Sequence, residues 1–342
     1  MFNKAYILAL TKDILLTDSP VGYTDDVMKK IESYAADLGF HMDYTVKGNG
    51  VITLAGQDHV NGVIGVSAHV DTLGLMVRSI KADGTLRFTS LGAPNLATLD
   101  GEYCRVRTRD GKLFTGTILS TKPALHVWKD ANTVARNEET MVVRLDEVVK
   151  SKDDVVKLGI GTGDFICIDT KTEMTETGFI KSRFLDDKLA VGILFGVMKY
   201  LRDNGLTPKR TVKILFSTYE EVGHGSSSIP ADITELISID MGCIGDDLSG
   251  TEYGVSICAK DTSGPYDFTL TNRMIDLARR EKLEHAVDIY PFYGSDTTAA
   301  LRGGNDIRGV LIGPGVAASH GMERSHYLAV ENTMKLLVSY LM

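Results

Sequence analysis

One stretch in the second half of the sequence, Ser217–Gly223, limits the folds that this chain can adopt. The apolar run before it, Val212–Phe216, is typical of a buried strand in a parallel sheet. Two adjacent carboxylates, Glu220 and Glu221, follow the run, and a glycine-rich loop comes next. Because neighbouring side chains of a strand point to opposite faces, both glutamates reach one site only if the strand ends near Tyr219. Such turns at the carboxyl ends of strands carry the functional residues of open α/β sheets, although a solvated strand end would explain the pair taken alone.

The composition is that of a globular protein and argues against two kinds of partner. Of the 342 residues, 43% are hydrophobic and 24% are charged, and the length suits two domains. The formal net charge of −8 argues against nucleic acid, because phosphate binding needs a basic face. No apolar run approaches the roughly 18 to 20 residues that span a bilayer, so no membrane partner is expected.

The beginning of the sequence and its cysteines predict a cytoplasmic location. Residues 1–16 lack the apolar core and the small-residue cleavage site of a signal peptide. The cysteines are scattered and form no Cys-x-x-Cys pair. This spacing favours buried thiols in a reducing compartment over a disulfide framework or a zinc knuckle. The residues concerned are Cys104, Cys167, Cys243 and Cys258.

Helical and strand-like segments alternate at both ends of the chain. Apolar spacing predicts helices over residues 3–16, 24–38, 186–201, 266–282 and 328–341, with Thr24 as an N-cap. Leu328, Leu336, Leu337 and Tyr340 are expected to face the core. Strands are expected over residues 50–54, 62–70, 211–219, 236–239 and 309–312. This alternation predicts an α/β fold with a doubly wound, mostly parallel sheet flanked by helices.

A β-rich segment interrupts this pattern. Between residues 73 and 177 the sequence shows short strands with hairpin turns at Asp83-Gly84 and Asp110-Gly111, and one short helix between residues 146 and 158. We therefore expect a discontinuous catalytic domain, residues 1–72 and 178–342, with a small barrel-like β domain inserted over residues 73–177.

Acids and histidines follow the predicted strands at equivalent ends, and Asp186 and Asp187 open a predicted helix. Each alone has an ordinary explanation, such as a core histidine or a helix N-cap, but together they point to one rim of the sheet. Mixed imidazole and carboxylate ligands suit zinc, cobalt or manganese better than calcium. Two metals about 3.5–4 Å apart, bridged by a carboxylate and a water, form a recurrent hydrolytic site. The residues are His69, Asp71, Asp186, Asp187, Glu220, Glu221, Asp240 and His320.

The order and spacing of these motifs resemble the TET-type dinuclear aminopeptidases, metallopeptidase family 42. The resemblance covers essentially the whole chain. It rests on His69–Gly74, Leu185–Lys188, Glu220–Gly223, Ser238–Asp240 and His320. The segments Phe179–Arg183 and Ser319–His326 further resemble a bacterial subgroup encoded beside genes for an acetylated glutaminylglutamine amide osmoprotectant.

The resemblance implies a role for each residue of the site. Asp186 would bridge both metals, with His69 and Asp240 completing one site and Glu221 and His320 the other. Glu220 would be the general acid and base, and Asp71 would fix the orientation of the His69 ring. The Asp186-Asp187 peptide bond would be cis. Dimers formed through the inserted domain would build a hollow dodecamer.

Three departures from the family pattern bear on the site. Thr72-Leu73 stands where relatives carry Glu-Ile, but the expected metal ligands are kept. Tyr293–Asp296 replaces a Gly-Thr-Asp segment, so Asp296 is a candidate substrate-binding residue, and Tyr293 either reshapes the pocket or packs as a core aromatic. His326 rivals His320 as a ligand, although counting back from the final helix favours His320.

The function expected from these features is a metal-dependent aminopeptidase that removes N-terminal residues from peptides. One alternative is a deacylase or dipeptidase that acts on a small acylated amide. Another is a non-catalytic assembly subunit stabilised by metal, which the intact Glu220 argues against. A glycosidase is a weaker idea, because the histidines would have no role.

Overall fold

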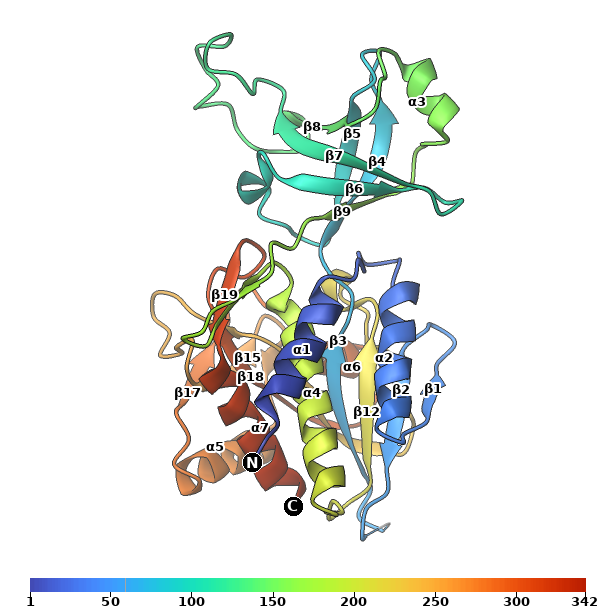
Figure 1. Ribbon diagram of the computed structural model, residues 1–342. Helices are drawn as coiled ribbons and strands as arrows, with labels where there is room; N and C mark the ends of the chain where they lie inside the picture. Colours follow the sequence, from blue (N-terminus) through green and yellow to red (C-terminus); the bar gives the residue numbers. More distant parts are fainter. Residues whose placement is uncertain (59) are drawn as a thin grey trace. The chain divides into compact units, whose positions relative to one another are not determined.

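The computed structural model describes residues 1–58 and 60–342, which form two compact units (Figure 1). The first unit comprises Met1–Asp71 and Lys171–Met342, and the second comprises Thr72–Thr170. The insert expected from the sequence, residues 73–177, extends further toward the C-terminus. The difference arises because β10 (Glu173–Met174) pairs with β11 (Phe179–Ser182), which in turn pairs with β19 (Glu323–His326) of the first unit.

A mixed sheet with a parallel centre forms the core of the first unit. Its central strands lie side by side in the order β12 (Val212–Ser217), β3 (Val63–His69), β13 (Ile233–Ile239) and β18 (Arg308–Val316). Antiparallel neighbours extend it at one edge with β2 (Gly50–Leu54) and β1 (Met42–Tyr44), and at the other with β15 (Val255–Asp261) and β16 (Gly264–Pro265). The strands β14 (Gly242–Cys243) and β17 (His285–Ile289) pair with β18 and β15. The predicted fold class is confirmed.

Helices cover both faces of this sheet, and the strand β12 shows how its sequence achieves this. Phe216 stacks on Phe195 of α4 (Leu185–Asp203), with ring centroids 5.5 Å apart. Its neighbour Leu215 points to the other face and joins a cluster with Ala300 of α6 (Asp296–Arg302). Figure 1 shows α4 on one side of the sheet and α6 on the other. Burial on both faces thus makes the centre of β12 largely apolar.

The remaining helices of the first unit agree with the predicted ones, with two local differences. They are α1 (Lys4–Leu15), α2 (Asp25–Asp37), α5 (Phe268–Arg280) and α7 (Tyr327–Leu341). Thr24 precedes α2 but makes no side-chain capping bond. Leu328 is 45% exposed, so the prediction that it faces the core was wrong. It lies eight residues before Leu336, which places it about 80° away around the helix. Across residues 1–58 and 60–342, none of the helices has the length and apolarity needed to cross a membrane.

The second unit is a closed antiparallel barrel. Its strands follow one another around the barrel in the order β4 (Gly74–Ile80), β5 (Leu86–Leu91), β8 (Met141–Leu145), β7 (Leu113–Ser120), β6 (Tyr103–Arg107) and β9 (Phe165–Ile168). The predicted hairpins at Asp83-Gly84 and Asp110-Gly111 are confirmed by the pairing of β4 with β5 and of β6 with β7. The predicted short helix is α3 (Lys152–Leu158).

Candidate metal centre

The acids and histidines singled out in the sequence meet at one rim of the sheet in the first unit. His69 is the last residue of β3, and it pairs in parallel register with Ser217, the last residue of β12. The pairing brings His69 beside the short 3-10 helix Glu220–Val222, which begins three residues after Ser217. Asp240 follows β13, the other neighbour of β3. The sequence prediction of one shared rim is confirmed for these strands.

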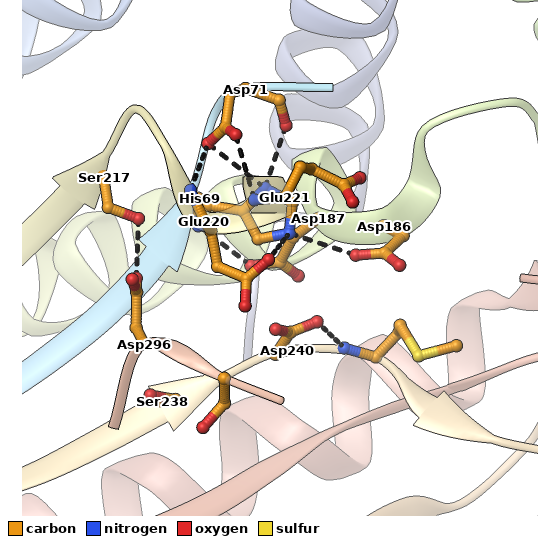
Figure 2. A network of polar contacts seen from close by, with 12 residues as sticks. His69, Asp71, Asp186, Asp187, Ser217, Glu220, Glu221, Ser238, Asp240 and Asp296 are labelled. Atoms are coloured by element: carbon orange, nitrogen blue, oxygen red, sulfur yellow. Dashed lines mark hydrogen bonds and ion pairs between the residues drawn. The ribbon is translucent and has the colours of Figure 1, made fainter. Parts of the chain in front are cut away.

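Asp186 lies at the centre of the cluster. Its Oδ1 is 3.1 Å from Nε2 of His69 (Figure 2). Its Oδ2 is 3.4 Å from Nε2 of His320. Nε2 of His320 is also 3.7 Å from Oε2 of Glu221. A single carboxylate therefore faces both histidines, as a bridging ligand must.

The start of α4 is shaped to present this carboxylate. Asp186 (φ −73°, ψ 101°) and Asp187 (φ −121°, ψ 21°) depart from helical geometry, and the peptide bond between them is cis. The predicted cis bond is therefore confirmed. Phe184, just before the helix, has a φ of 68°. The chain thus turns sharply at the rim before the regular helix begins.

Asp71 holds two parts of the cluster together. Its main-chain oxygen lies 2.9 Å from Nδ1 of His69, which leaves Nε2 of that ring pointing at Asp186. Its carboxylate accepts the backbone N–H groups of Glu220 at 3.1 Å and Glu221 at 3.2 Å. The main-chain oxygen of Asp71 is thus the nearer partner of His69 Nδ1, with the Asp71 Oδ1 3.6 Å away, and the Asp71 side chain also fixes the Glu220-Glu221 turn (Figure 2).

Asp240 and Asp187 form the other side of the cluster. Asp240 accepts the backbone N–H of Met241 at 2.6 Å, and Asp187 accepts the backbone N–H of His69 at 3.1 Å. Among the described residues, the buried atoms Oδ1 of Asp187 and Oε1 of Glu221 have no hydrogen-bond partner. Buried carboxylate oxygens without partners are costly unless a cation or proton neutralises them.

Crowding and burial perturb the ionisation of these acids. Burial raises the pKa of Glu221 to about 8, of Asp240 to about 7 and of Asp71 to about 6. Burial acts on Asp186 in the same direction, but its contacts with His320 and His69 hold its pKa below the usual range. Several carboxylates thus share a volume that cannot hold all their charges without a cation.

The donor set fits divalent cations. His69, Asp186 and Glu221 each offer a ligand atom within 4.8 Å of the others, and so do His69, Asp187 and Asp240. The orphaned oxygens of Glu221 and Asp187 belong to these groups. Imidazole nitrogens together with carboxylate oxygens are suitable ligands for zinc, cobalt or manganese.

A cavity of about 220 Å³ opens onto this cluster. Its lining includes the carboxylate residues Asp186, Glu220, Glu221 and Asp240, together with His320, Phe292, Tyr293, Thr298 and Arg302. The Tyr293 hydroxyl donates to the main-chain oxygen of Met241 at 3.2 Å, so the ring forms a fixed wall beside Asp240. Tyr293 also packs against Tyr290, with ring centroids 5.3 Å apart, so it both lines the pocket and packs as a core aromatic.

Asp296, the candidate substrate-binding residue, lies at the first turn of α6 and is buried. One carboxylate oxygen accepts the Ser217 hydroxyl at 2.6 Å, and the other accepts the Ser226 backbone N–H at 2.8 Å (Figure 2). A Cβ atom at Gly225 would collide with the same carboxylate. Asp296 thus joins both ends of the loop that carries Glu220 and Glu221.

The two rival histidines are in different surroundings. His320 faces Asp186 and Glu221, as described above. His326 instead uses Nε2 toward the main-chain oxygen of Thr177 at 2.9 Å, and its Nδ1 accepts the backbone N–H of Leu328 at 3.1 Å. Both ring nitrogens of His326 are therefore occupied at the start of α7.

Sequence reasoning overlooked Glu323. This buried carboxylate accepts the backbone N–H of Asp186 at 3.1 Å and of His320 at 3.0 Å. The sequence signal for Glu323 is its position three residues after His320, within the Ser319–His326 segment. An acid so close to an expected ligand is a reasonable candidate for supporting that ligand.

Known proteins with similar sequences carry aminopeptidase names. A family model described as M42 glutamyl aminopeptidase matches residues 48–336. The putative aminopeptidase YhfE of Bacillus subtilis (strain 168) is 42% identical over 334 residues, covering 97% of this chain and 96% of YhfE. The glutamyl aminopeptidase of Lactococcus lactis subsp. cremoris (strain MG1363) is 27% identical over 203 residues, covering 59% of this chain and 56% of that protein.

Solved structures share the fold over nearly the whole chain. A TET aminopeptidase from the marine sediment archaeon Thaumarchaeota archaeon SCGC AB-539-E09 has a TM-score of 0.87 at 19% identity, covering 98% of this chain and 96% of that one. The Pyrococcus horikoshii TET1 peptidase has a TM-score of 0.84 at 22% identity, covering 98% and 99%.

A rim of acids and histidines with unpartnered carboxylate oxygens, placed on this sheet and beside a cavity, defines a metal-dependent hydrolase. The family match and the extended similarity to YhfE make the assignment more specific. The chain belongs to the M42 family of metallo-aminopeptidases and is a peptidase, and this family has a dinuclear metal site.

Proposed function

We propose that this enzyme removes N-terminal residues from peptides, with Glu220 as the general acid and base. The observation that carries the proposal is the position of Glu220. Its side chain is 14% exposed and lines the cavity, and its Oε2 lies 3.7 Å from Nε2 of His69. Glu220 is thus an acid beside the cluster that the proposed ligand set does not use. Its side chain is accessible to a substrate in the cavity.

The metal ligands proposed here are those that the family resemblance implies, and the contacts of Asp186 with His69 and His320 support them. Asp186 would bridge two cations, with His69 and Asp240 on one side and Glu221 and His320 on the other. When bound, the cations would act as Lewis acids that lower the pKa of a water molecule and polarise the scissile carbonyl. We propose zinc or cobalt, with manganese as a further candidate, because of the mixed nitrogen and oxygen donors.

The chain's own groups would handle the proton. Glu220 would accept a proton from the attacking water and return it to the leaving amine. Asp71 would hold the Glu220 backbone so that the carboxylate faces the cavity. Asp296 would contribute to substrate binding indirectly, because its contacts with Ser217 and Ser226 shape the loop beside the pocket.

The test compares wild-type enzyme with Glu220→Gln on aminoacyl amides. General acid–base catalysis contributes about 10²- to 10⁴-fold, so we expect a kcat loss of that order with metal content unchanged. Chelation should abolish wild-type activity, and zinc or cobalt should restore it. Near wild-type turnover of Glu220→Gln would refute the role, and absence of wild-type turnover with metal bound would favour a non-catalytic assembly subunit.

A narrower proposal concerns the substrate. The segments Phe179–Arg183 and Ser319–His326 support membership of the subgroup associated with the acetylated glutaminylglutamine amide osmoprotectant, whose enzymes would act on a small acylated amide. Paired free-amine and N-acetylated versions of one peptide amide separate the two activities. An aminopeptidase rejects the blocked version, whereas a deacylase or a dipeptidase of this kind hydrolyses it.

We also propose that the enzyme forms dimers through the Thr72–Thr170 barrel and that the dimers assemble into dodecamers. The support is the fold shared with the dodecameric PhTET1-12s, with a TM-score of 0.84. Light scattering on the intact chain tests the assembly, because a monomeric mass would refute it.

A further inference from the structure

Glu323 is a buried acid next to the cluster of acids and histidines that forms the candidate metal centre. It begins β19 and is 2% exposed. One carboxylate oxygen accepts the backbone N–H of Asp186, and the other accepts the backbone N–H of His320. A single side chain thus connects two expected ligands that are 134 positions apart in the sequence, as their numbers show.

The backbone at both of these ligands needs such a partner. Asp186 lies where α4 has not yet adopted helical geometry, so its N–H has no place in a regular helical ladder. A buried N–H without an acceptor costs about 1–3 kcal/mol. Glu323 provides that acceptor.

His320 is held in an unfavourable conformation. Its φ is 62° and that of Ala318 is 59°, in the left-handed region that costs non-glycine residues roughly 1–2 kcal/mol each. The loop is closed by backbone bonds between Ala317 and Arg324 at 2.8 and 3.2 Å. Within this loop, the Glu323 carboxylate is the acceptor that the structure gives to the His320 N–H. Without it, the loop would lose a bond that opposes relaxation of the histidine.

We infer that Glu323 is a positioning residue that keeps Asp186 and His320 close enough to hold cations together. The inference rests on the proposed function only in taking these two residues as metal ligands. Both carboxylate oxygens of Glu323 accept backbone N–H groups, those of Asp186 and His320. It acts through the backbone of its two partners, as outer groups that orient metal ligands do.

The chain offers a matched control. Asp288 is also a buried carboxylate, 6% exposed, and it accepts the backbone N–H groups of Ser249 at 2.8 Å and Gly250 at 2.9 Å. It lies on β17, outside the cluster. Replacing either acid by its amide removes one acceptor from a pair of backbone N–H groups, so the two variants should lose similar stability.

The experiment measures zinc and cobalt affinity of full-length wild type, Glu323→Gln and Asp288→Asn by competition with a chromophoric chelator. Loss of outer groups typically costs about 10- to 100-fold in metal affinity, and we expect a loss in that range for Glu323→Gln alone. The affinity of Asp288→Asn should stay within about threefold of wild type. Equal affinities for wild type and Glu323→Gln, or equal losses in both variants, would overturn the inference.

A measurement on the wild-type enzyme covers the case in which Glu323→Gln fails to fold. Hydrogen exchange of the His320 and Asp186 amides is followed with and without zinc. Protection already present without zinc supports positioning by Glu323, whereas protection that appears only with zinc overturns it. A wild type that binds metal tightly but hydrolyses nothing would refute the proposed function and leave this result standing.

Discussion

The backbone N–H of Glu220 donates to the Asp71 carboxylate across 3.1 Å, so the proposed proton carrier is held by a residue from another strand. Asp71 follows β3 and Glu220 follows β12, and these two strands are parallel neighbours. The main-chain oxygen of Asp71 also orients His69. One residue thereby sets the distance between an expected metal ligand and the proposed base.

We predict that Asp71→Asn lowers kcat without removing metal. The amide keeps one acceptor but turns an NH₂ group toward a backbone N–H, which shifts the Glu220-Glu221 turn. A misplacement of about 1 Å can cost roughly 100-fold in rate. The measurement is kcat together with metal content by elemental analysis. Asp267→Asn, which alters the acceptor of the Leu270 N–H at the start of α5, serves as control and should leave kcat unchanged. An unaltered kcat in Asp71→Asn would contradict the prediction.

Replacement of the two histidines should separate a ligand from a structural residue. His320→Ala removes the imidazole that faces Asp186 and Glu221, so we expect bound metal to fall from two ions per subunit toward one, with a large loss of activity. His326→Ala removes an acceptor at the start of α7 and should cost about 1 kcal/mol of stability while keeping the metal. Metal stoichiometry and thermal unfolding test the pair, and the reverse pattern would make His326 the ligand.

The rim of the site could be predicted from the sequence because His69, Glu220 and Asp240 follow strand-like runs, whereas Asp186 opens a predicted helix. Apart from the half-buried Lys213, Val212–Phe216 is apolar because the strand is buried on both faces, and this also indicates where the strand ends. Once several such ends are recognised, parallel pairing brings them together, as His69 and Ser217 show. The position of these residues thus depends on local patterns that can be recognised in the sequence.

The supporting contacts could not be predicted, since they depend on tertiary pairing. Glu323 reaches Asp186 only because the chain turns back after β18, where Ala317 bridges to Arg324 of β19. Likewise, residues 173–174 form a strand too short to recognise, and it belongs to the first unit only through β11 and β19. A sequence motif also does not reveal that Asp71 contacts His69 through its main-chain oxygen and Glu220 through its carboxylate.

Tyr293 should control the size of the substrate pocket. Its ring lines the cavity, and its hydroxyl is bonded to Met241 beside Asp240. Tyr293→Phe keeps the wall and loses one hydrogen bond worth about 1 kcal/mol, so kcat/KM should fall about fivefold. Tyr293→Ala opens the cavity and should shift preference toward substrates with larger first residues. The comparison uses kcat/KM for alanyl and phenylalanyl amides, and an unchanged ratio in Tyr293→Ala would refute the assignment.

Metal removal should make stability depend on pH in a defined direction. The pKa of Asp71 is raised from 3.8 to about 6, that of Asp240 from 3.8 to about 7 and that of Glu221 from 4.5 to about 8. A carboxyl group with a higher pKa in the folded state binds more protons when folded, so its contribution to stability falls as pH rises through that window. The lowered pKa of Asp186 acts in the opposite direction, but below about pH 4.

Chelator-treated enzyme should therefore unfold at a lower temperature at pH 8 than at pH 6. Zinc should reduce this difference, because bound cations neutralise the ionised carboxylates. The measurement is calorimetry at both pH values, with and without zinc, and a chelated enzyme that is more stable at pH 8 would contradict the crowding of acids on which the metal assignment depends.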